Sequence, residues 1–450
     1  MIDDNWLLMQ RAPKLTGGKF LKMSSSLYNY FRGTLRIFLR DVTRPGPLSY
    51  PTQFATVDTA LVVSVLDPHP ENIGTYRNQK GTITVDFNDF DGSIYVPYYL
   101  DVRRLTVGFA MCGIMAGLDT KEPTEYKILL EQVSKGYIEE IRDIRQGKSG
   151  IKIRAKEGFG LILDDLLRRA KEQGLERRNM TVYTKVEAGK RLMRYGDLEP
   201  SDKGFIIKKL AEPTDREQQM LSKLLGGYHR TKLQAKDSSA KLPKVKAFAR
   251  KFGSGVSSYP RLRYYALLEG PTKGVQDDWL LEIKELADPA TIPGFIRFPK
   301  QIFANNAQRV VWIQRHLQEF KDNDHHLGWA TLGPMVFRIN QLTRYQKGFD
   351  HERFLEKFHK KKWSIGDLQL FAYHSGRLLA RSHTQIPTLQ DSKTVSAITD
   401  ALGEEPKAFA EETVQFAKAY AKQMKQDFAL FKALLKEKGP LLGYIPTNAR

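Results

Sequence analysis

The sequence predicts an α+β protein with two lobes, in which a small β-rich region interrupts an otherwise helical chain. Strand-like runs gather at about 244–343, and helical periodicity dominates on both sides of them. Near the start of the chain, two short acidic stretches each follow a further strand-like run. We therefore expect residues 1–230 to form the first part of a large helical lobe, residues 244–345 a small β-rich lobe, and residues 346–450 the rest of the large lobe.

Composition restricts the class of protein without choosing a function. Hydrophobic residues make up 41% and charged residues 27% of the 450 residues, which are values of a folded globular protein. The formal net charge is +20 and the pI is about 9.6. Such a charge favours phosphorylated ligands, nucleic acid or an anionic membrane surface as partners, and it is equally compatible with a basic solvated surface that has no dedicated partner.

The sequence shows no sign of a disulfide, a secretion signal or a membrane span. The single cysteine, Cys112, lies in an apolar run, so an intramolecular disulfide is excluded and the thiol is expected to be buried. The first residues, Met1-Ile-Asp-Asp4, are acidic where a signal peptide is basic. No apolar run approaches the roughly 20 residues that a membrane-spanning helix needs. We therefore expect a soluble, cytoplasmic protein.

Local patterns predict the individual elements in order. In the first half we expect a helix at 23–41, a break at 44–51, strands at 60–66 and 82–85, and helices at about 100–118 and 122–145. Residues 150–225 show no pattern that we interpret. In the second half we expect a polar connection at 233–246, strands at 245–252, 263–269, 279–284 and 335–342, and helices at 306–321, 352–361, 364–383 and 408–438.

The first acidic stretch, Asp67-Pro-His-Pro-Glu-Asn72, places a carboxylate and an amide five positions apart after a strand. Phosphoryl transfer needs a carboxylate near the acceptor hydroxyl and a neutral oxygen ligand for Mg²⁺, both held by a rigid turn. Prolines at 68 and 70 would stiffen such a turn. The alternative is a plain Asp-Pro turn with an asparagine that ends the strand.

The second acidic stretch, Asp86-Phe-Asn-Asp-Phe-Asp91, supplies three more carboxylates. A tight reversal at 78–81 would return the chain and bring Asp86 beside Asn72 at neighbouring strand ends. Magnesium takes carboxylate oxygens, so Asn72, Asp86, Asp89 and Asp91 are all candidate metal ligands. Three carboxylates within six residues is dense for a merely solvated turn. The combination of strand, acidic loop, strand and acidic turn is typical of protein-kinase-like folds.

A glycine turn and a lysine strand lie in the β-rich region. Gly253-Ser254-Gly255 follows one strand, and glycines let backbone N–H groups approach phosphate oxygens, although such a turn is often only a hairpin. Lys284 lies on a later, largely apolar strand, so it needs an anionic partner unless it reaches solvent at a sheet edge. Candidate partners on the following helix or the same strand are Glu319, Gln314, Glu282 and Glu285.

Basic side chains near the acidic stretches are candidates for substrate or phosphate binding. Arg32, His69, Arg103 and Arg104 belong to this group. Arginines beside an acidic phosphate site either bind substrate phosphate or hold the carboxylates in ion pairs, and the sequence leaves both roles open.

At these residues the chain resembles a bacterial family known as the domain of unknown function 2252, which is grouped with the protein-kinase-like superfamily. The resemblance spans about 20–435 and is most specific in the two acidic stretches. Supporting motifs are Tyr30-Phe-Arg-Gly33, Leu100-Asp-Val-Arg-Arg-Leu105, Leu267-Leu-Glu-Gly270, Ile283-Lys-Glu285, Gln308-Arg-Val-Val311 and Gly376-Arg-Leu-Leu-Ala-Arg-Ser-His383. The family pattern resembles Gly-Asp-x-His-x-x-Asn, and here Leu66 stands in the place of the glycine, where its side chain would crowd the turn.

The resemblance implies a kinase-like fold whose segments follow an unusual order. In ordinary kinases the glycine loop and the lysine strand precede the catalytic loop, whereas here they lie at 253–284, after the acidic loops at 67–91. Only 66 residues precede Asp67, too few for a helix and a complete nucleotide-binding lobe. Leu378-Leu-Ala-Arg-Ser-His383 resembles the helix that normally leads into a catalytic loop, yet no such loop follows it. We therefore expect a permuted kinase-like fold.

The function that these features favour is a kinase-like phosphotransferase that uses ATP and Mg²⁺ to phosphorylate a hydroxyl of a small molecule or, less favoured, of a protein. Asp67 would be the catalytic residue, and Lys284, with residues 253–255, would bind the nucleotide in the 244–345 lobe. One alternative is a pseudokinase that binds nucleotide without turnover, which Leu66 favours. Another is a basic nucleic-acid-binding protein, which the acidic stretches disfavour.

Overall fold

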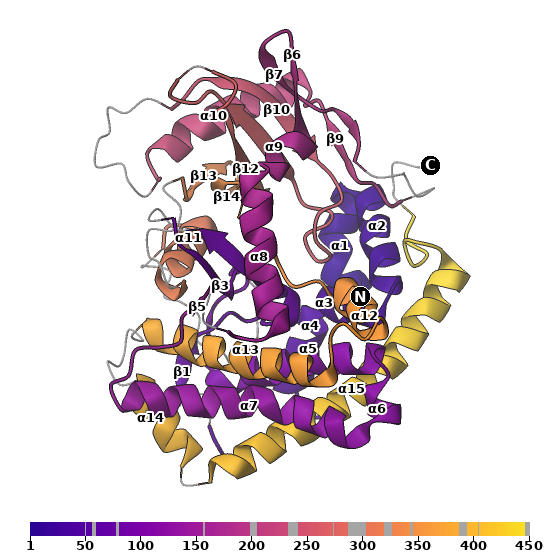
Figure 1. Cartoon of the computed structure of the whole chain (residues 1–450). Helices are drawn as coiled ribbons and strands as arrows, with labels where there is room; N and C mark the ends of the chain where they lie inside the picture. The colour runs from indigo at the N-terminus through magenta and orange to yellow at the C-terminus, as the bar shows by residue number, and fades with distance from the viewer. Residues whose placement is uncertain are drawn as a thin grey trace.

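The computed structural model describes residues 1–49, 51–55, 60–77, 81–155, 158–198, 205–232, 242–272, 274–286, 303–318, 326–342, 345–386, 394–403 and 405–445. It contains both helices and sheets, so the predicted α+β class is confirmed. Figure 1 shows a large sheet and one covering helix at the top, and a group of long helices at the bottom. None of the helices in the described ranges is long and apolar enough to cross a membrane.

Four helices open the chain: α1 (Ile2–Arg11), α2 (Pro13–Ser24), α3 (Leu27–Gly33) and α4 (Leu35–Thr43). The prediction of one helix over 23–41 is therefore wrong. Ser26 begins a new helix because its side chain accepts a hydrogen bond from the Asn29 backbone N–H at 3.0 Å, which satisfies a first-turn donor. The resulting turn lets α2 and α3 pack against each other instead of forming one long helix.

Short strands carry the acidic stretches. β1 (Leu61–Val63) pairs with β4 (Tyr95–Pro97), and β2 (Ile73–Arg77) pairs antiparallel with β3 (Ile83–Phe87), which also pairs with β5 (Ile153–Arg154). Both strands of the predicted hairpin are confirmed, whereas its turn at 78–80 lies outside the described residues. Gly74 is opposite Asp86 in the register. The first acidic stretch thus ends, and the second begins, at the same end of one hairpin.

Long helices form the largest core. They are α5 (Tyr98–Met115), α7 (Pro123–Arg145), α13 (Ile365–Gln385) and α15 (Pro406–Lys438), with the shorter α6 (Leu118–Lys121) and α14 (Thr394–Leu402) beside them. Helices were predicted at the positions of all four long helices, and α14 was not predicted. α7 and α13 approach closely because Gly136 and Gly376 have no side chain: a Cβ on Gly376 would lie 2.1 Å from the Val133 carbonyl oxygen.

The main sheet has seven strands in the order β13-β14-β12-β11-β10-β9-β8. Each neighbouring pair is antiparallel. The strands are β8 (Gly196–Asp197), β9 (Lys209–Ala211), β10 (Val245–Lys251), β11 (Arg263–Leu268), β12 (Trp279–Glu285), β13 (Gly328–Leu332) and β14 (Met335–Gln341). The four strands predicted in the β-rich region are confirmed as β10, β11, β12 and β14. β8, β9 and β13 were not predicted, and the first two bring residues from before 230 into the sheet.

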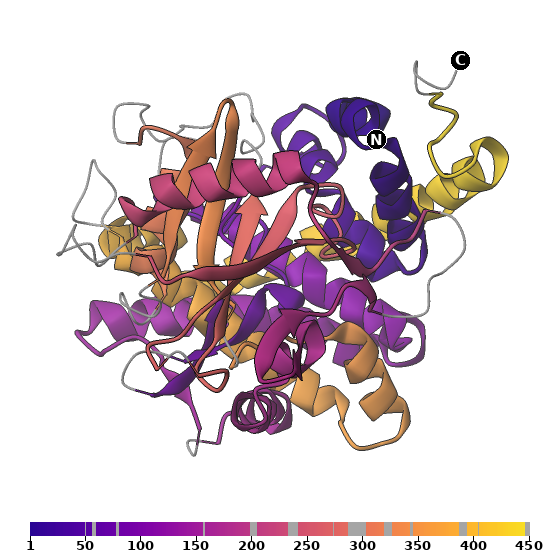
Figure 2. The same ribbon diagram turned by 90° about the horizontal axis from the view of Figure 1, so that it is seen from above.

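Alternation along the strands decides which side chains face the helical core. On β12, Leu281 and Ile283 pack against α10 (Asp215–His229), which covers the outer face of the sheet in Figure 2. Leu280 packs in the separate cluster on the other face. Because successive side chains in a strand point to opposite faces, Lys284 projects to the same side as Leu280, away from α10. That side is the one that faces the acidic stretches.

The remaining elements connect the sheet to the helices. The hairpin of β6 (Thr184–Glu187) and β7 (Lys190–Met193) follows α8 (Leu161–Leu175) and α9 (Arg178–Tyr183). α11 (Asn306–Leu317) lies between the sheet and the acidic segment, where Arg309 donates to the Asp91 carbonyl oxygen at 2.9 Å. After β14, the chain passes beside β2 through a bridge between Gly74 and Gly348 and enters α12 (His351–His359).

Replacing Gly376 with alanine is expected to destabilise the protein. The new Cβ would meet backbone of α7, which cannot move aside as a flexible side chain can, so we expect a loss of about 1–3 kcal/mol despite the better helix propensity of alanine. Gly366→Ala in the same helix is the matched control, since Gly366 is exposed and its nearest atom would lie 3.5 Å away. Urea unfolding of both variants tests this, and equal midpoints would contradict the close packing of α7 and α13.

Candidate functional site

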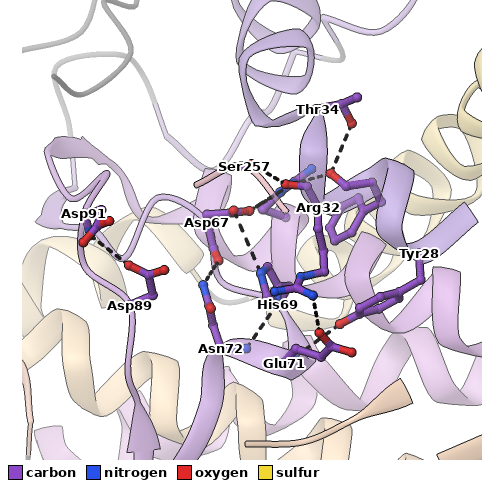
Figure 3. Close-up of polar contacts among 12 residues, drawn as sticks. Tyr28, Arg32, Thr34, Asp67, His69, Glu71, Asn72, Asp89, Asp91 and Ser257 are labelled. Carbon is purple, nitrogen blue, oxygen red and sulfur yellow. Dashed lines mark hydrogen bonds and ion pairs between the residues drawn. The ribbon is translucent and has the colours of Figure 1, made fainter. Parts of the chain in front are cut away.

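The first acidic stretch is a rigid loop between β1 and β2. Pro70 begins a short 3-10 helix, η1 (Pro70–Asn72), and His69 caps it by accepting the Asn72 backbone N–H on Nδ1 at 3.1 Å. The Asn72 side-chain amide donates to the Asp67 carbonyl oxygen at 2.8 Å. The predicted proximity of Asp67 and Asn72 follows from these two bonds (Figure 3). The bond to Asp67 uses the amide nitrogen of Asn72, so its amide oxygen is available to bind a cation.

A buried carboxylate from α5 holds the start of this loop. Asp101 is 1% exposed, and its two oxygens accept the backbone N–H groups of Val65 at 2.8 Å and Leu66 at 3.1 Å. His383 at the end of α13 lies 3.1 Å from the same carboxylate through Nε2, and its Nδ1 lies 2.8 Å from the Tyr137 hydroxyl. This chain of contacts joins α5, α7 and α13 to the loop.

Leu66 adopts the left-handed backbone conformation, with φ of +66°. Glycine is the residue that adopts this conformation without cost, and a leucine there loses roughly 1–2 kcal/mol. The expected crowding of the turn therefore takes the form of backbone strain. The side chain is 2% exposed and packs in the main core, so its burial offsets part of that strain.

Asp67 faces a cavity of about 210 Å³ between the acidic loops, the N-terminal helices and the loop after β10. Arg104, three residues after Asp101 on α5, donates to Asp67 Oδ1 at 2.9 Å and stacks over Phe31. The Nε2 of His69 lies 4.0 Å from Asp67 Oδ2. Burial lowers the pKa of His69 to about 4 against the opposing effect of Asp67, so the ring is neutral at pH 7.

The second acidic stretch divides between two environments. Asp86 is fully buried, and Arg381 of α13 donates to its carboxylate, so it points into the core rather than into the cavity. Asp89 and Asp91 lie beyond the end of β3, and both line the cavity. Figure 3 shows this pair beside Asp67 and Asn72.

Lys284 contacts this acidic pair. Its ammonium lies 2.7 Å from Asp91 Oδ2 and 3.6 Å from Asp89 Oδ2, and its side chain is 6% exposed. Two of the partners considered from the sequence bind elsewhere, since Glu282 pairs with Arg263 at 2.6 Å and Glu285 with Arg11 at 2.6 Å. Gln314 accepts from Arg338, and Glu319 lies outside the described residues. Lys284 thus joins the sheet to the acidic stretch.

The two carboxylates beside Lys284 have opposite electrostatic tendencies. Burial and the Asp91 charge raise the pKa of Asp89. Burial acts in the same direction on Asp91, but Lys284 and Arg338 outweigh it and hold the pKa of Asp91 well below its usual range. Asp91 Oδ1 is buried and has no hydrogen-bond partner among the described residues. A cation placed here would find two adjacent carboxylates and one unused oxygen.

The glycine turn reaches the same cavity. Gly253 and Gly255 have φ of +79° and +76°, and a Cβ on Gly253 would lie 2.2 Å from the Ile207 carbonyl oxygen, so glycine is required there. Gly255 lines the cavity, whereas Ser254 is half-buried and is not among the lining residues. Ser257 in the same loop donates to the Arg32 carbonyl oxygen at 2.8 Å, which fastens the loop to α3.

The candidate phosphate-binding arginines have different surroundings. Arg104 forms an ion pair with Asp67. Holding a carboxylate in this way is one of the two roles that the sequence left open. Arg103 points away from the cavity to Glu412 of α15, 2.6 Å away, and stacks over Phe416. Arg32 lines the cavity and pairs with Glu71.

Glu71 is the centre of a buried polar network beneath the loop. It binds Arg32 and lies 2.5 Å from His351 Nδ1, and its backbone N–H donates to the Tyr28 hydroxyl at 3.2 Å. Glu71, His351 and Asp350 form the one group of at least three His, Cys, Asp or Glu side chains in the described ranges whose ligand atoms lie close enough together for a metal ion. Asp350 accepts the first-turn backbone N–H groups of α12, and Glu71 forms an ion pair with Arg32. These contacts give the cluster a structural role without a metal ion.

The residues predicted from the sequence to bind a metal divide between the cavity and the core. Asn72, Asp89 and Asp91 offer only oxygen donors to one cavity, which is the chemistry that Mg²⁺ prefers. The unused buried oxygen of Asp91 supports such a ligand set. Asp86 does not belong to it, because Arg381 already neutralises its charge.

Comparison with known families gives one match. The family described as an uncharacterized protein conserved in bacteria, the domain of unknown function 2252, matches residues 11–434. The chain belongs to this family. No curated protein and no solved structure matches the chain. Membership confirms the resemblance found in the acidic stretches, and the family's description assigns no activity.

Sequence reasoning missed several residues that build the site. Asp101 and Arg381 looked like ordinary polar positions on helices, although both lie in motifs that carry the family resemblance. The available signal was a charge placed among apolar residues of a long helix, because a buried charge requires a partner. Lys19 and Arg261, which also line the cavity, carried no such signal.

Removing the Asp101 carboxylate is expected to destabilise the protein strongly. Asp101→Ala leaves two buried backbone N–H groups and His383 without their acceptor, so we expect a loss of about 3–5 kcal/mol. Asp101→Asn retains one oxygen and should lose less. Glu411→Gln, an exposed acid on α15, serves as the control and should change the unfolding free energy by under about 0.5 kcal/mol. Urea unfolding measures the stability of all three variants. An unchanged unfolding free energy in Asp101→Ala would contradict the role of Asp101 in holding the loop.

The Glu71 network predicts a pH-dependent stability. Burial opposes ionisation of Glu71, but Arg32 and His351 outweigh it and lower its pKa from 4.5 to about 2. Because the folded-state pKa lies below the unfolded one, the carboxylate stabilises the fold fully above about pH 4.5, and this contribution is lost as the pH falls towards 2. At pH 7 the free energy of unfolding of the wild type should exceed that of Glu71→Gln by about 3 kcal/mol. Urea unfolding from pH 3 to 7 should show this difference shrinking on acidification, and a constant difference would count against the network.

Proposed function

We propose that the protein is a kinase-like phosphotransferase that uses ATP and Mg²⁺ to phosphorylate a hydroxyl of a small molecule. One observation carries the proposal. Residues about two hundred positions apart line one cavity, which includes Asp67, Asn72, Asp89, Asp91 and Gly255. Lys284 lies 2.7 Å from Asp91 and 3.6 Å from Asp89. A carboxylate, a cation-binding set, a glycine loop and a buried lysine are the parts that phosphoryl transfer needs.

Each residue would have a defined role. Asp67 would orient the acceptor hydroxyl and take its proton, since it is partly exposed to the cavity and held in place by Arg104. Asn72, Asp89 and Asp91 would hold Mg²⁺, which supplies charge neutralisation at the transferred phosphoryl group. Lys284 would exchange its contact with Asp91 for the α/β-phosphates, beneath the loop that contains Gly253 and Gly255.

The proposed fold is the permuted kinase-like one, with a small lobe at about 244–345 between two parts of a large lobe. The contacts at the end of α13 support it. Arg381 binds Asp86 and His383 approaches Asp101, so this helix ends beside the acidic segment although almost 300 positions separate them in the chain. In ordinary kinases the corresponding helix leads directly into the catalytic loop, and here the same spatial order would be reached by a different chain order.

A pseudokinase is the second candidate, and Leu66 is the observation that favours it. Its left-handed conformation adds strain next to the proposed catalytic residue, and Asp67 is already paired with Arg104. Such a protein would bind nucleotide and respond to it without transferring phosphate.

Thermal unfolding with ATP, ADP and GTP, with and without Mg²⁺, tests both candidates. We expect stabilisation by a purine nucleotide that requires Mg²⁺; a ligand at 100 times its Kd adds about 2.7 kcal/mol. Lys284→Met should abolish this stabilisation, whereas Lys190→Met on the exposed β6–β7 hairpin should not. Absence of stabilisation by any nucleotide would refute the proposal.

Turnover then separates the enzyme from the pseudokinase. We expect slow ATP hydrolysis or transfer that falls by roughly 10²–10⁴-fold in Asp67→Asn, with nucleotide stabilisation retained. Nucleotide-dependent stabilisation without any turnover in wild type would instead identify the pseudokinase.

A further inference from the structure

Basic side chains gather at the end of the cavity that the N-terminal helices form. Lys19 of α2, Arg36 of α4 and Arg261 of the loop after β10 all line the cavity that contains Asp67. Among the described residues, none of the three has a carboxylate within 4.0 Å (the ion-pair distance). The site described above uses none of these residues.

Lys19 is the most constrained of them. Its side chain is 5% exposed, and its ammonium donates to the neutral Asn5 Oδ1 at 2.6 Å. The negative charge of Asp4 acts to raise the pKa of Lys19. Arg40, however, donates to both carboxylate oxygens of Asp4, at 3.0 and 2.9 Å. Burial, Arg261 and Arg36 lower the pKa of Lys19 to about 7. A buried lysine without a carboxylate is unfavourable unless an anion completes it.

Arg261 and Arg36 add to this unneutralised charge. Burial lowers the pKa of Arg261, although Glu285 and Asp91 oppose the change. Both acids are already engaged, Glu285 by Arg11 at 2.6 Å and Asp91 by Lys284 at 2.7 Å. Arg36 is exposed at the mouth of the cavity, where a guanidinium can turn towards a ligand.

The beginning of α4 faces the same place. Residues 33–37 line the cavity, and Thr34 does not cap the helix, because its hydroxyl donates to the carbonyl oxygens of Tyr30 and Phe31. First-turn backbone N–H groups carry partial positive charge and add to the field of the three side chains.

We propose that Lys19, Arg36 and Arg261 bind a phosphate monoester group of the acceptor, so that the acceptor is a hydroxy compound that already carries a phosphate. This inference rests on the proposed function. A phosphate dianion matches two guanidinium groups and an ammonium better than a carboxylate does, because a carboxylate carries one negative charge. With its phosphate at this end, the acceptor extends along the cavity towards Asp67.

The reaction then balances as an ordinary kinase transfer. The hydroxyl oxygen of the acceptor forms a bond to the γ-phosphorus of ATP, and the bond from that phosphorus to the β–γ bridging oxygen breaks. The hydroxyl proton passes to Asp67, and ADP leaves. The product is a bisphosphorylated compound.

The experiment uses the full chain without nucleotide and three matched probes: glycerol 3-phosphate, glycerate and glycerol, with inorganic phosphate as a fourth ligand. Calorimetry at pH 6.5, below the pKa of Lys19, should show binding of glycerol 3-phosphate and phosphate, at least tenfold weaker binding of glycerate, and none of glycerol. Failure of both phosphate-bearing probes to bind would overturn the inference.

Variants then locate the site. Lys19→Met should weaken glycerol 3-phosphate binding by about 10–100-fold, because it removes the buried ammonium that would contact the phosphate. Arg36→Gln, which changes an exposed residue, should weaken it as well. Lys14→Met on the same helix, where Lys14 is exposed, is the control and should have no effect.

Parallel titrations with Mg²⁺ and ATP distinguish the two proposals. Unchanged nucleotide binding in Lys19→Met, with lost binding of glycerol 3-phosphate, supports the inference. Equal loss of both would assign the cluster to the phosphates of ATP and overturn it. Binding of glycerol 3-phosphate without any nucleotide binding would refute the proposed kinase function while the anion site remains.

Discussion

The Asp101 carboxylate is the interaction on which the candidate site depends. A turn with a leucine in the left-handed conformation is unfavourable in isolation, and Asp101 stabilises it by accepting the backbone N–H groups of Val65 and Leu66. Arg104, one helical turn further along α5, fixes the side chain of Asp67. One helix thus sets both the backbone and the reactive carboxylate of the loop, and His383 ties that helix to α13.

Ion pairs hold the parts of the molecule together around the cavity. Lys284 joins β12 to the acidic pair, Arg381 joins α13 to β3, and Arg11 joins α1 to the end of β12. Each is long-range in sequence, and each places a cation against a carboxylate that burial would otherwise destabilise. Within the described ranges, Lys19 and Arg261 have no carboxylate at ion-pair distance. That contrast, rather than the total charge of +20, marks the end of the cavity where an anionic ligand is expected.

Local spacing explains which parts of the site were predictable. Asp67 and Asn72 are five positions apart and separated by prolines, so their proximity needs only a turn, and the β2–β3 hairpin follows from two apolar runs with a polar reversal. The role of Asp86 was harder to predict because β3 continues to Phe87, two residues past the apolar run. Its side chain therefore lies on the same face as Thr84, within a strand whose two faces are both buried, whereas Asp89 and Asp91 lie beyond the strand. The partner of Lys284 and the position of Lys19 depend on contacts between segments far apart, which no local pattern encodes.

Leu66 also shares space with a second residue. Gly92, at the end of the other acidic stretch, faces its side chain, and a Cβ on Gly92 would lie 3.2 Å from the Leu66 Cδ2. The side chain of Leu66 therefore fills the volume between the two acidic loops, and Gly92 contributes no side chain to it. Replacing Leu66 with glycine would leave that volume free for a side chain at the position of Gly92. The two acidic loops are in this way linked by shape as well as by charge.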